Sequence, residues 1–142
     1  MTTYTPPIRT RENILVVDDV RTLKFEATTV RRLPQAEAAL YSQPWDEVWL
    51  DHDLEFSMTL EETQLMHTYN IRPLVQKIEQ DARNGIILPV GIFIIHSANS
   101  IGKEWMAQML LPWYTTAVAH AYDWTQKERY PDWARIDENG WD

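Results

Sequence analysis

The sequence contains no cysteine. Disulfide bonds, thiolate zinc sites and cysteine nucleophiles are therefore excluded, and a reducing, cytoplasmic compartment is the default expectation. No apolar run approaches the roughly 20 residues that a membrane-spanning helix needs. The first residues, 1–12, also lack the apolar core of a secretory signal. We therefore expect no contact with a membrane.

Positive charge is also scarce, because 13 Lys and Arg stand against 21 Asp and Glu and give a net charge of −8. Proteins that wrap a nucleic-acid duplex need a basic face to replace the counterions of the phosphates. The charge balance therefore argues against duplex DNA or RNA as a partner. It leaves room for a small phosphate-containing ligand held through a metal ion, where local charge outweighs the total.

The 142 residues, 44% of them hydrophobic, are enough for one globular domain with one core. We expect a flexible lead over residues 1–12 and the folded domain over 13–121. The seven Trp residues include several near the end of the chain. Residues 122–142 are expected to form a Trp-rich extension. It either packs on the domain or makes a subunit contact in a homo-oligomer, since aromatic side chains favour interfaces.

Short apolar runs predict strands at residues 13–17, 26–31, 47–50, 90–95 and 115–121. Amphipathic segments predict helices over residues 34–40, 60–68, 70–84 and 100–111. In the last of these, the buried stripe is expected to include Ile101, Trp105 and Met109. Strands that alternate with helices are typical of βαβ units, so the pattern predicts an α/β fold with a parallel sheet.

Polar clusters follow three of the predicted strands: Asp18-Asp19, Asp51-His52-Asp53 and His96-Ser97-Ala98-Asn99. The carboxyl ends of parallel strands lie at one edge of the sheet, where ligands bind in open α/β folds. Carboxylates brought together there repel one another unless a cation or shared protons compensate. Oxygen ligands favour Mg²⁺, Mn²⁺ or Ca²⁺, and Mg²⁺ or Mn²⁺ is the expected cofactor. The alternative is that some of these Asp residues cap the helices that follow.

Two histidines and two small polar residues complete this candidate site. His52 and His96 are candidates for acid–base catalysis, and His96 is alternatively a metal ligand or a histidine bonded to a backbone carbonyl. Ser97 and Asn99 are candidates for holding a phosphate oxygen, and Ser97 as a nucleophile is a minor alternative.

The basic candidates for phosphate contacts are Lys103 and Arg21, with ordinary solvent-exposed side chains as the alternative. The remaining histidines, His67 and His120, lie outside the clusters and are expected to be structural.

The strand ends resemble those of a receiver domain, the CheY-like fold of response regulators, in the strings Ile14–Asp19, Val48–Asp51 and Ile94–Ala98. The resemblance implies a flavodoxin- or CheY-like three-layer sandwich with a mostly parallel five-stranded sheet. The first helix would be shortened, since few residues separate Asp19 from the second strand. Asp18 and Asp19 would match the acidic pair of the family, Asp51 its phosphoacceptor and Ser97 its hydroxyl. The lysine that the family has after its fifth strand has no counterpart in residues 115–121, which offer only His120, so ordinary phosphorelay signalling is not expected.

The sequence resembles the cyclic-phosphate processing receiver domain more fully. Three motifs carry this resemblance: the acidic pair Asp18-Asp19, the string Leu50-Asp51-His52-Asp53-Leu54 and the string His96-Ser97-Ala98-Asn99. Glu55 and Ser100 depart from the Gly and Pro that are common there. The resemblance implies an enzyme, or at least a binder, that acts on cyclic nucleotides or cyclic-phosphate RNA ends. Our leading hypothesis is a metal-dependent phosphoesterase in which Asp18, Asp19 and Asp51 hold the ion. Asp53 is then a further ligand or an orienting residue, and attack of Asp51 on phosphorus is a minor variant. One alternative is a non-catalytic protein that sequesters a cyclic nucleotide, for instance a phage-type anti-defence protein. Another is a degenerate receiver used for protein contacts.

Overall fold

The computed structural model describes four stretches of the chain, residues 5–18, 25–52, 70–97 and 100–119. Their strands are β1 (Ile14–Val17), β2 (Thr28–Val30), β3 (Trp45–Leu50), β4 (Val90–His96) and β5 (Thr116–Ala119). Their helices are α1 (Leu33–Leu40), α3 (Arg72–Arg83) and α4 (Ser100–Leu110). The strands and helices predicted in these stretches are confirmed, with ends that shift by a residue or two.

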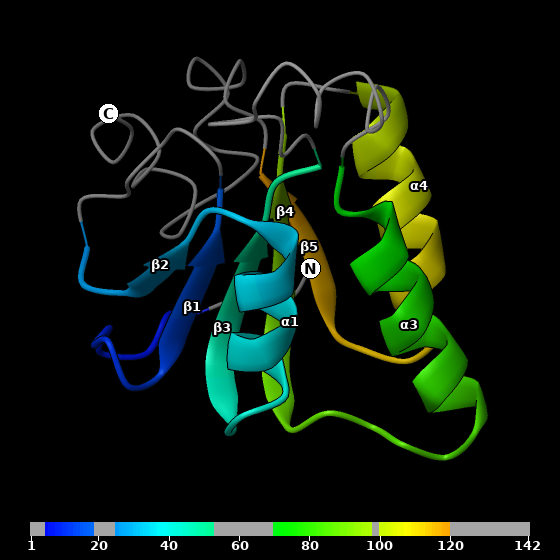
Figure 1. The fold of residues 1–142 in the computed structure, drawn as a ribbon. Coiled ribbons are helices and arrows are strands. Elements are labelled where there is room, and N and C mark those ends of the chain that lie inside the picture. Colours follow the sequence, from blue (N-terminus) through cyan, green and yellow to red (C-terminus); the bar gives the residue numbers. More distant parts are fainter. Residues whose placement is uncertain (1–4, 19–24, 53–69, 98–99, 120–142) are drawn as a thin grey trace.

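The five strands form one sheet in the order β2-β1-β3-β4-β5, and every neighbouring pair is parallel. The chain passes from β1 to β2 on one side and then to β3 on the other, so the strand order reverses between β1 and β3. This is an α/β receiver-like fold, consistent with the CheY-like sandwich that the motifs implied (Figure 1). All carboxyl strand ends lie at one edge, hereafter the carboxyl edge.

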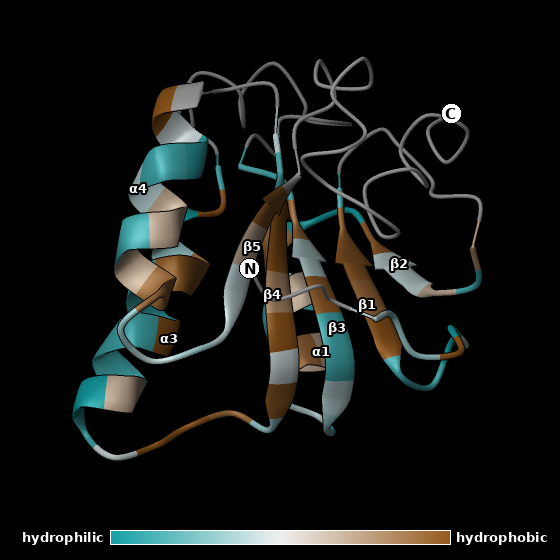
Figure 2. Cartoon of the chain, turned by 180° about the vertical axis from the view of Figure 1, so that it is seen from behind, coloured by the Kyte–Doolittle hydropathy of each residue, from teal (hydrophilic) through white to brown (hydrophobic). Residues whose placement is uncertain are grey.

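The three helices cover one face of the sheet, which we call the helix face. Leu15, Val48 and Phe93 point to this face, and they pack with buried residues of the helices such as Leu40 and Ile78. The second face holds a smaller cluster around Trp49, and Figure 2 shows no described helix across it. Burial of apolar side chains in such clusters supplies most of the stability of a domain.

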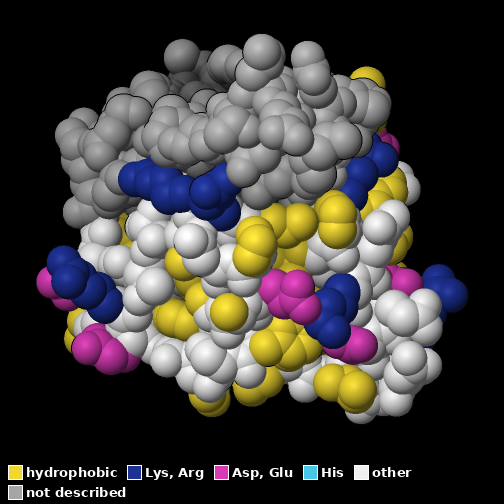
Figure 3. All heavy atoms as spheres, viewed as in Figure 1, with side chains coloured by type: hydrophobic (Ala, Val, Ile, Leu, Met, Phe, Trp, Pro, Cys, Tyr) yellow, Lys and Arg dark blue, Asp and Glu magenta, His cyan; other side chains and the backbone are white. Residues whose placement is uncertain are grey.

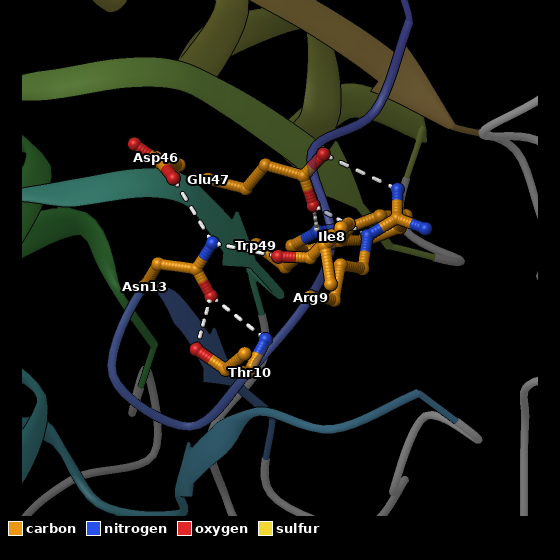
Figure 4. A network of polar contacts seen from close by, with 7 residues as sticks. All are labelled: Ile8, Arg9, Thr10, Asn13, Asp46, Glu47 and Trp49. Carbon is orange, nitrogen blue, oxygen red and sulfur yellow. Dashed lines mark hydrogen bonds and ion pairs between the residues drawn. The ribbon is translucent and has the colours of Figure 1, made fainter.

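A short N-terminal segment lies against the second face. Arg9 donates to the two carboxylate oxygens of the buried Glu47 at 2.8 and 3.2 Å (Figure 4). Its guanidinium also lies 4.5 Å from the ring centroid of Phe25. Asn13 donates to the carbonyl of Ile8 and to Asp46. These contacts fasten the part of the predicted lead that the structure describes.

Helix α3 follows its sequence pattern closely. The predicted apolar face is buried, at Ile71, Leu74, Val75, Ile78 and Ala82. Gly85 follows the helix with a φ of 87°, a left-handed conformation that glycine adopts without steric cost. The helix predicted over residues 70–84 therefore ends within a residue of its expected end.

The predicted stripe of α4 is wrong. Ile101 is 75% exposed, and the buried positions are instead Gly102, Lys103, Met106 and Leu110. Trp105 and Met109 are only half-buried. The helix is therefore turned so that its smallest residue faces the sheet, a choice that apolar periodicity cannot reveal.

Glu79 joins α3 to the loop after α4. Its carboxylate accepts hydrogen bonds from Arg83 at 2.6 Å and from Trp113 Nε1 at 3.0 Å. The bond from Arg83 is the larger cause, and with Trp113 it lowers the pKa of Glu79 below its ordinary value of 4.5, against the opposing effect of burial.

This shift predicts a pH dependence of stability. A carboxyl group with a lowered folded-state pKa stabilises the fold above its unfolded pKa, and that contribution is lost as the pH falls through the folded value. We expect wild type to lose stability relative to Glu79→Gln as the pH falls below about 4.5. Urea unfolding of both proteins from pH 7 to pH 3 measures the difference. A constant difference across this range would contradict the prediction.

Several predicted features lie outside the described residues. They are the shortened first helix, the helix at 60–68, the Trp-rich extension at 122–142, and His67 and His120. Within the described stretches, the helices are too short and too polar to cross a bilayer.

Candidate functional site

The carboxyl edge brings together Asp18 and Asp51, which follow β1 and β3. Val17 pairs with Leu50 in the parallel register, and the Asp51 N–H donates to the Val17 carbonyl at 2.9 Å. Neighbouring strands are about 4.8 Å apart, so the two residues lie side by side at this edge. They are 0% and 6% exposed, respectively. The pair also marks the place where the strand order reverses, which is the usual ligand site in such sheets.

His96 ends the neighbouring strand β4 and faces Asp18. Its Nδ1 lies 3.6 Å from Asp18 Oδ2, and both side chains are fully buried. The ring also meets Trp49 edge-on, with centroids 5.6 Å apart, which fixes the imidazole over the second face. The Asp18 carboxylate and the His96 imidazole therefore lie close together at this edge, which keeps His96 a candidate for acid–base chemistry. Ser97 follows directly and is buried.

His52 points the other way, toward the helix face. Its ring lies against Gly102 of α4, and its Nε2 accepts a hydrogen bond from Arg72 Nε at 3.0 Å. Arginine has only donors, so Nε2 holds a lone pair and the proton of the neutral ring is on Nδ1. Strand alternation places the side chains of Asp51 and His52 on opposite sides of the sheet, in agreement with these contacts.

The basic and remaining polar candidates have mixed outcomes. Lys103 is only 4% exposed, so the alternative of a solvent-exposed lysine is wrong. Asp19, Asp53, Asn99 and Arg21 lie outside the described residues. Among residues 5–18, 25–52, 70–97 and 100–119, no three His, Asp or Glu side chains are grouped so that they could hold a metal. Asp18 and Asp51 supply two carboxylates, and the Mg²⁺ or Mn²⁺ site stays a prediction.

A scan of family models matches residues 13–112 to the cyclic-phosphate processing receiver domain. The chain belongs to this family. The match covers more than two thirds of the chain and includes the ends of β1, β3 and β4. Searches of the curated proteins and of the solved structures found no match.

In this receiver domain, sequence reasoning missed two residues around His52, Arg72 and Gly102, whereas it expected the third, Trp105, in the buried stripe of its helix. The Arg72 guanidinium lies 4.6 Å from the ring centroid of Trp105, so three elements meet there. One feature of the sequence could have indicated Arg72. It is the first residue of a helix, where the macrodipole disfavours a cation.

Substituting Gly102 is expected to displace His52 in the receiver domain. A Cβ at this position would lie less than 3.0 Å from three atoms of the His52 ring. Gly102→Ala should destabilise the fold by about 1–3 kcal/mol, the usual cost of overpacking. Urea unfolding measures this loss.

Gly102→Ala combined with His52→Ala is the control, because it removes the ring that the methyl group meets. The double variant should lose less stability than the sum of the two single variants. Strict additivity would contradict the contact as the cause.

Proposed function

We propose that this protein is a metal-dependent phosphoesterase that opens cyclic phosphates. The observation that carries the proposal is the pair of buried carboxylates, Asp18 and Asp51, on adjacent parallel strand ends. Two buried acidic groups at this spacing are costly unless a cation or a proton compensates. A divalent ion fits the chemistry of their oxygen atoms.

The proposed roles in this site are metal binding and phosphate binding. Asp18 and Asp51 hold the ion, with Asp19 and Asp53 of the same motifs as further ligands. A bound Mg²⁺ or Mn²⁺ supplies neutralisation of phosphate charge and ionisation of water. Ser97 and Asn99 hold a phosphate oxygen at the end of β4.

His96 is the proposed general acid. When water attacks phosphorus, one P–O ester bond of the ring breaks and the leaving alkoxide needs a proton. The protonated form of His96 delivers that proton to the alkoxide, and the product is a linear phosphomonoester. His52 has its Nε2 engaged by Arg72 and is assigned a positioning role.

The test is a hydrolysis panel with the purified full chain. It contains 3′,5′-cyclic AMP and GMP, 2′,3′-cyclic AMP, cyclic di-GMP and an RNA oligonucleotide with a 2′,3′-cyclic phosphate end. Each is incubated with Mg²⁺, with Mn²⁺ or with EDTA, and the nucleotides are analysed after denaturation.

We expect a linear product that requires the metal. If intact nucleotide is recovered from a stable complex, the protein is a sequestering protein and the proposal of an enzyme is wrong. Folded protein that neither binds nor converts any member of the panel would overturn the proposal and favour a degenerate receiver.

A further inference from the structure

Arg72 is a cation at the carboxyl edge of the sheet. It begins α3, and its side chain is fixed by two neighbours, the His52 ring and the Trp105 ring. We propose that Arg72 binds the phosphate oxygens of the ligand at the α3 side of this edge. The inference rests on the proposed function, because it assumes that a phosphate ligand occupies the site.

The contacts of Arg72 leave its outer end unused. Nε donates to His52 at 3.0 Å, and the flat face of the guanidinium stacks on Trp105. Within the part of the chain that the structure describes, these contacts and the backbone N–H bond to Asn70 are its polar interactions, and none of them uses Nη1 or Nη2. Two parallel N–H donors therefore keep a fixed direction, the geometry with which arginine binds phosphate bidentately.

The position of Arg72 has an electrostatic cost that an anion would offset. A cation in the first turn of a helix opposes the positive end of the macrodipole. A long side chain also loses rotamer freedom when it is held by two rings. The hydrogen bond to His52 and the stacking on Trp105 oppose these costs, and a bound phosphate would oppose them further.

The neighbourhood agrees with this role. His52, the partner of Arg72, directly follows Asp51 in the chain and points to the helix face, so Arg72 approaches the carboxyl edge from the side of α3 and α4. On the other side of the acidic pair, Arg31 donates to the backbone carbonyl of Asp18 at 3.3 Å. Lys and Arg side chains also gather along this edge in Figure 3, although the chain as a whole has a net charge of −8.

The experiment compares wild type with Arg72→Ala, Arg72→Lys and Arg83→Ala. Arg83 is the matched control, because it is the same residue type at the opposite end of the same helix, with its side chain 65% exposed. Calorimetric titration measures binding of inorganic phosphate and of slowly hydrolysed phosphorothioate analogues of 3′,5′- and 2′,3′-cyclic AMP, in Mg²⁺. A separate titration measures Mg²⁺ alone.

We expect Arg72→Ala to weaken anion binding about 10- to 100-fold, which is typical of losing charged hydrogen bonds. Arg72→Lys should recover part of this loss, because it restores the charge but not the bidentate donors. Arg83→Ala should bind within about twofold of wild type, since exposed charges contribute little. Mg²⁺ affinity should be similar in all four proteins.

The outcomes separate this inference from the proposed function. If wild type binds none of the probes, both the proposed function and this inference are wrong. Wild-type affinity in Arg72→Ala overturns the inference alone, as does an equal loss in Arg83→Ala. If Arg72→Ala does not fold, Arg72→Lys decides, because an unchanged affinity in that variant overturns the bidentate role.

Discussion

Asp51→Asn is expected to lower Mg²⁺ affinity and metal-dependent turnover by at least about 100-fold. The amide keeps the shape of the side chain but removes the negative charge that holds a hard cation. Removing a single group that only supports metal ligands already costs about 10- to 100-fold, so loss of a direct ligand should cost more. Calorimetric Mg²⁺ titration and steady-state turnover measure the two effects.

Asp46→Asn is the control for this variant. Asp46 lies near the amino end of β3, where it is exposed and accepts a hydrogen bond from Asn13 at 2.9 Å. The two acidic residues thus lie near opposite ends of the same strand. Asp46→Asn should retain wild-type turnover, and Asp51→Asn with turnover within twofold of wild type would contradict the metal assignment.

Glu47→Ala is expected to give the largest loss of stability. The Glu47 carboxylate is fully buried and accepts bonds from Arg9 at 2.8 and 3.2 Å and from Trp49 Nε1 at 3.0 Å (Figure 4). The truncation leaves a buried guanidinium and an indole N–H without their acceptor. Breaking a buried ion pair from one side costs about 3–5 kcal/mol. Urea unfolding with an unchanged m-value would report this loss.

Replacing both Arg9 and Glu47 by apolar residues tests whether the unpaired Arg9 guanidinium causes the loss of stability in Glu47→Ala. Replacement of both members of a buried ion pair by apolar residues is often close to neutral. Arg9→Met combined with Glu47→Leu should therefore recover more than half of the stability that Glu47→Ala loses. A double variant that is less stable than Glu47→Ala would contradict this account. Turnover per folded molecule should be unchanged, since Glu47 lies away from the carboxyl edge.

The sequence determined the frame of the site. Apolar runs such as residues 90–95 are too short for helices and too apolar for exposed strands, so they specify buried parallel strands. A parallel sheet necessarily collects the residues after its strands at one edge. The adjacency of Asp18 and Asp51 could therefore be predicted from residues more than thirty positions apart.

The tertiary structure decided how the side chains around that frame are held. Apolar periodicity placed Ile101 in the core, whereas the sheet receives Gly102, because only a residue without a side chain fits against the His52 ring. Arg72 contacts His52, which follows β3, and Trp105 of α4. These contacts form through tertiary packing, and the local sequence around Arg72 does not specify them. Patterns specify which elements form and where they end, but rotation and close contact depend on the whole core being filled at once.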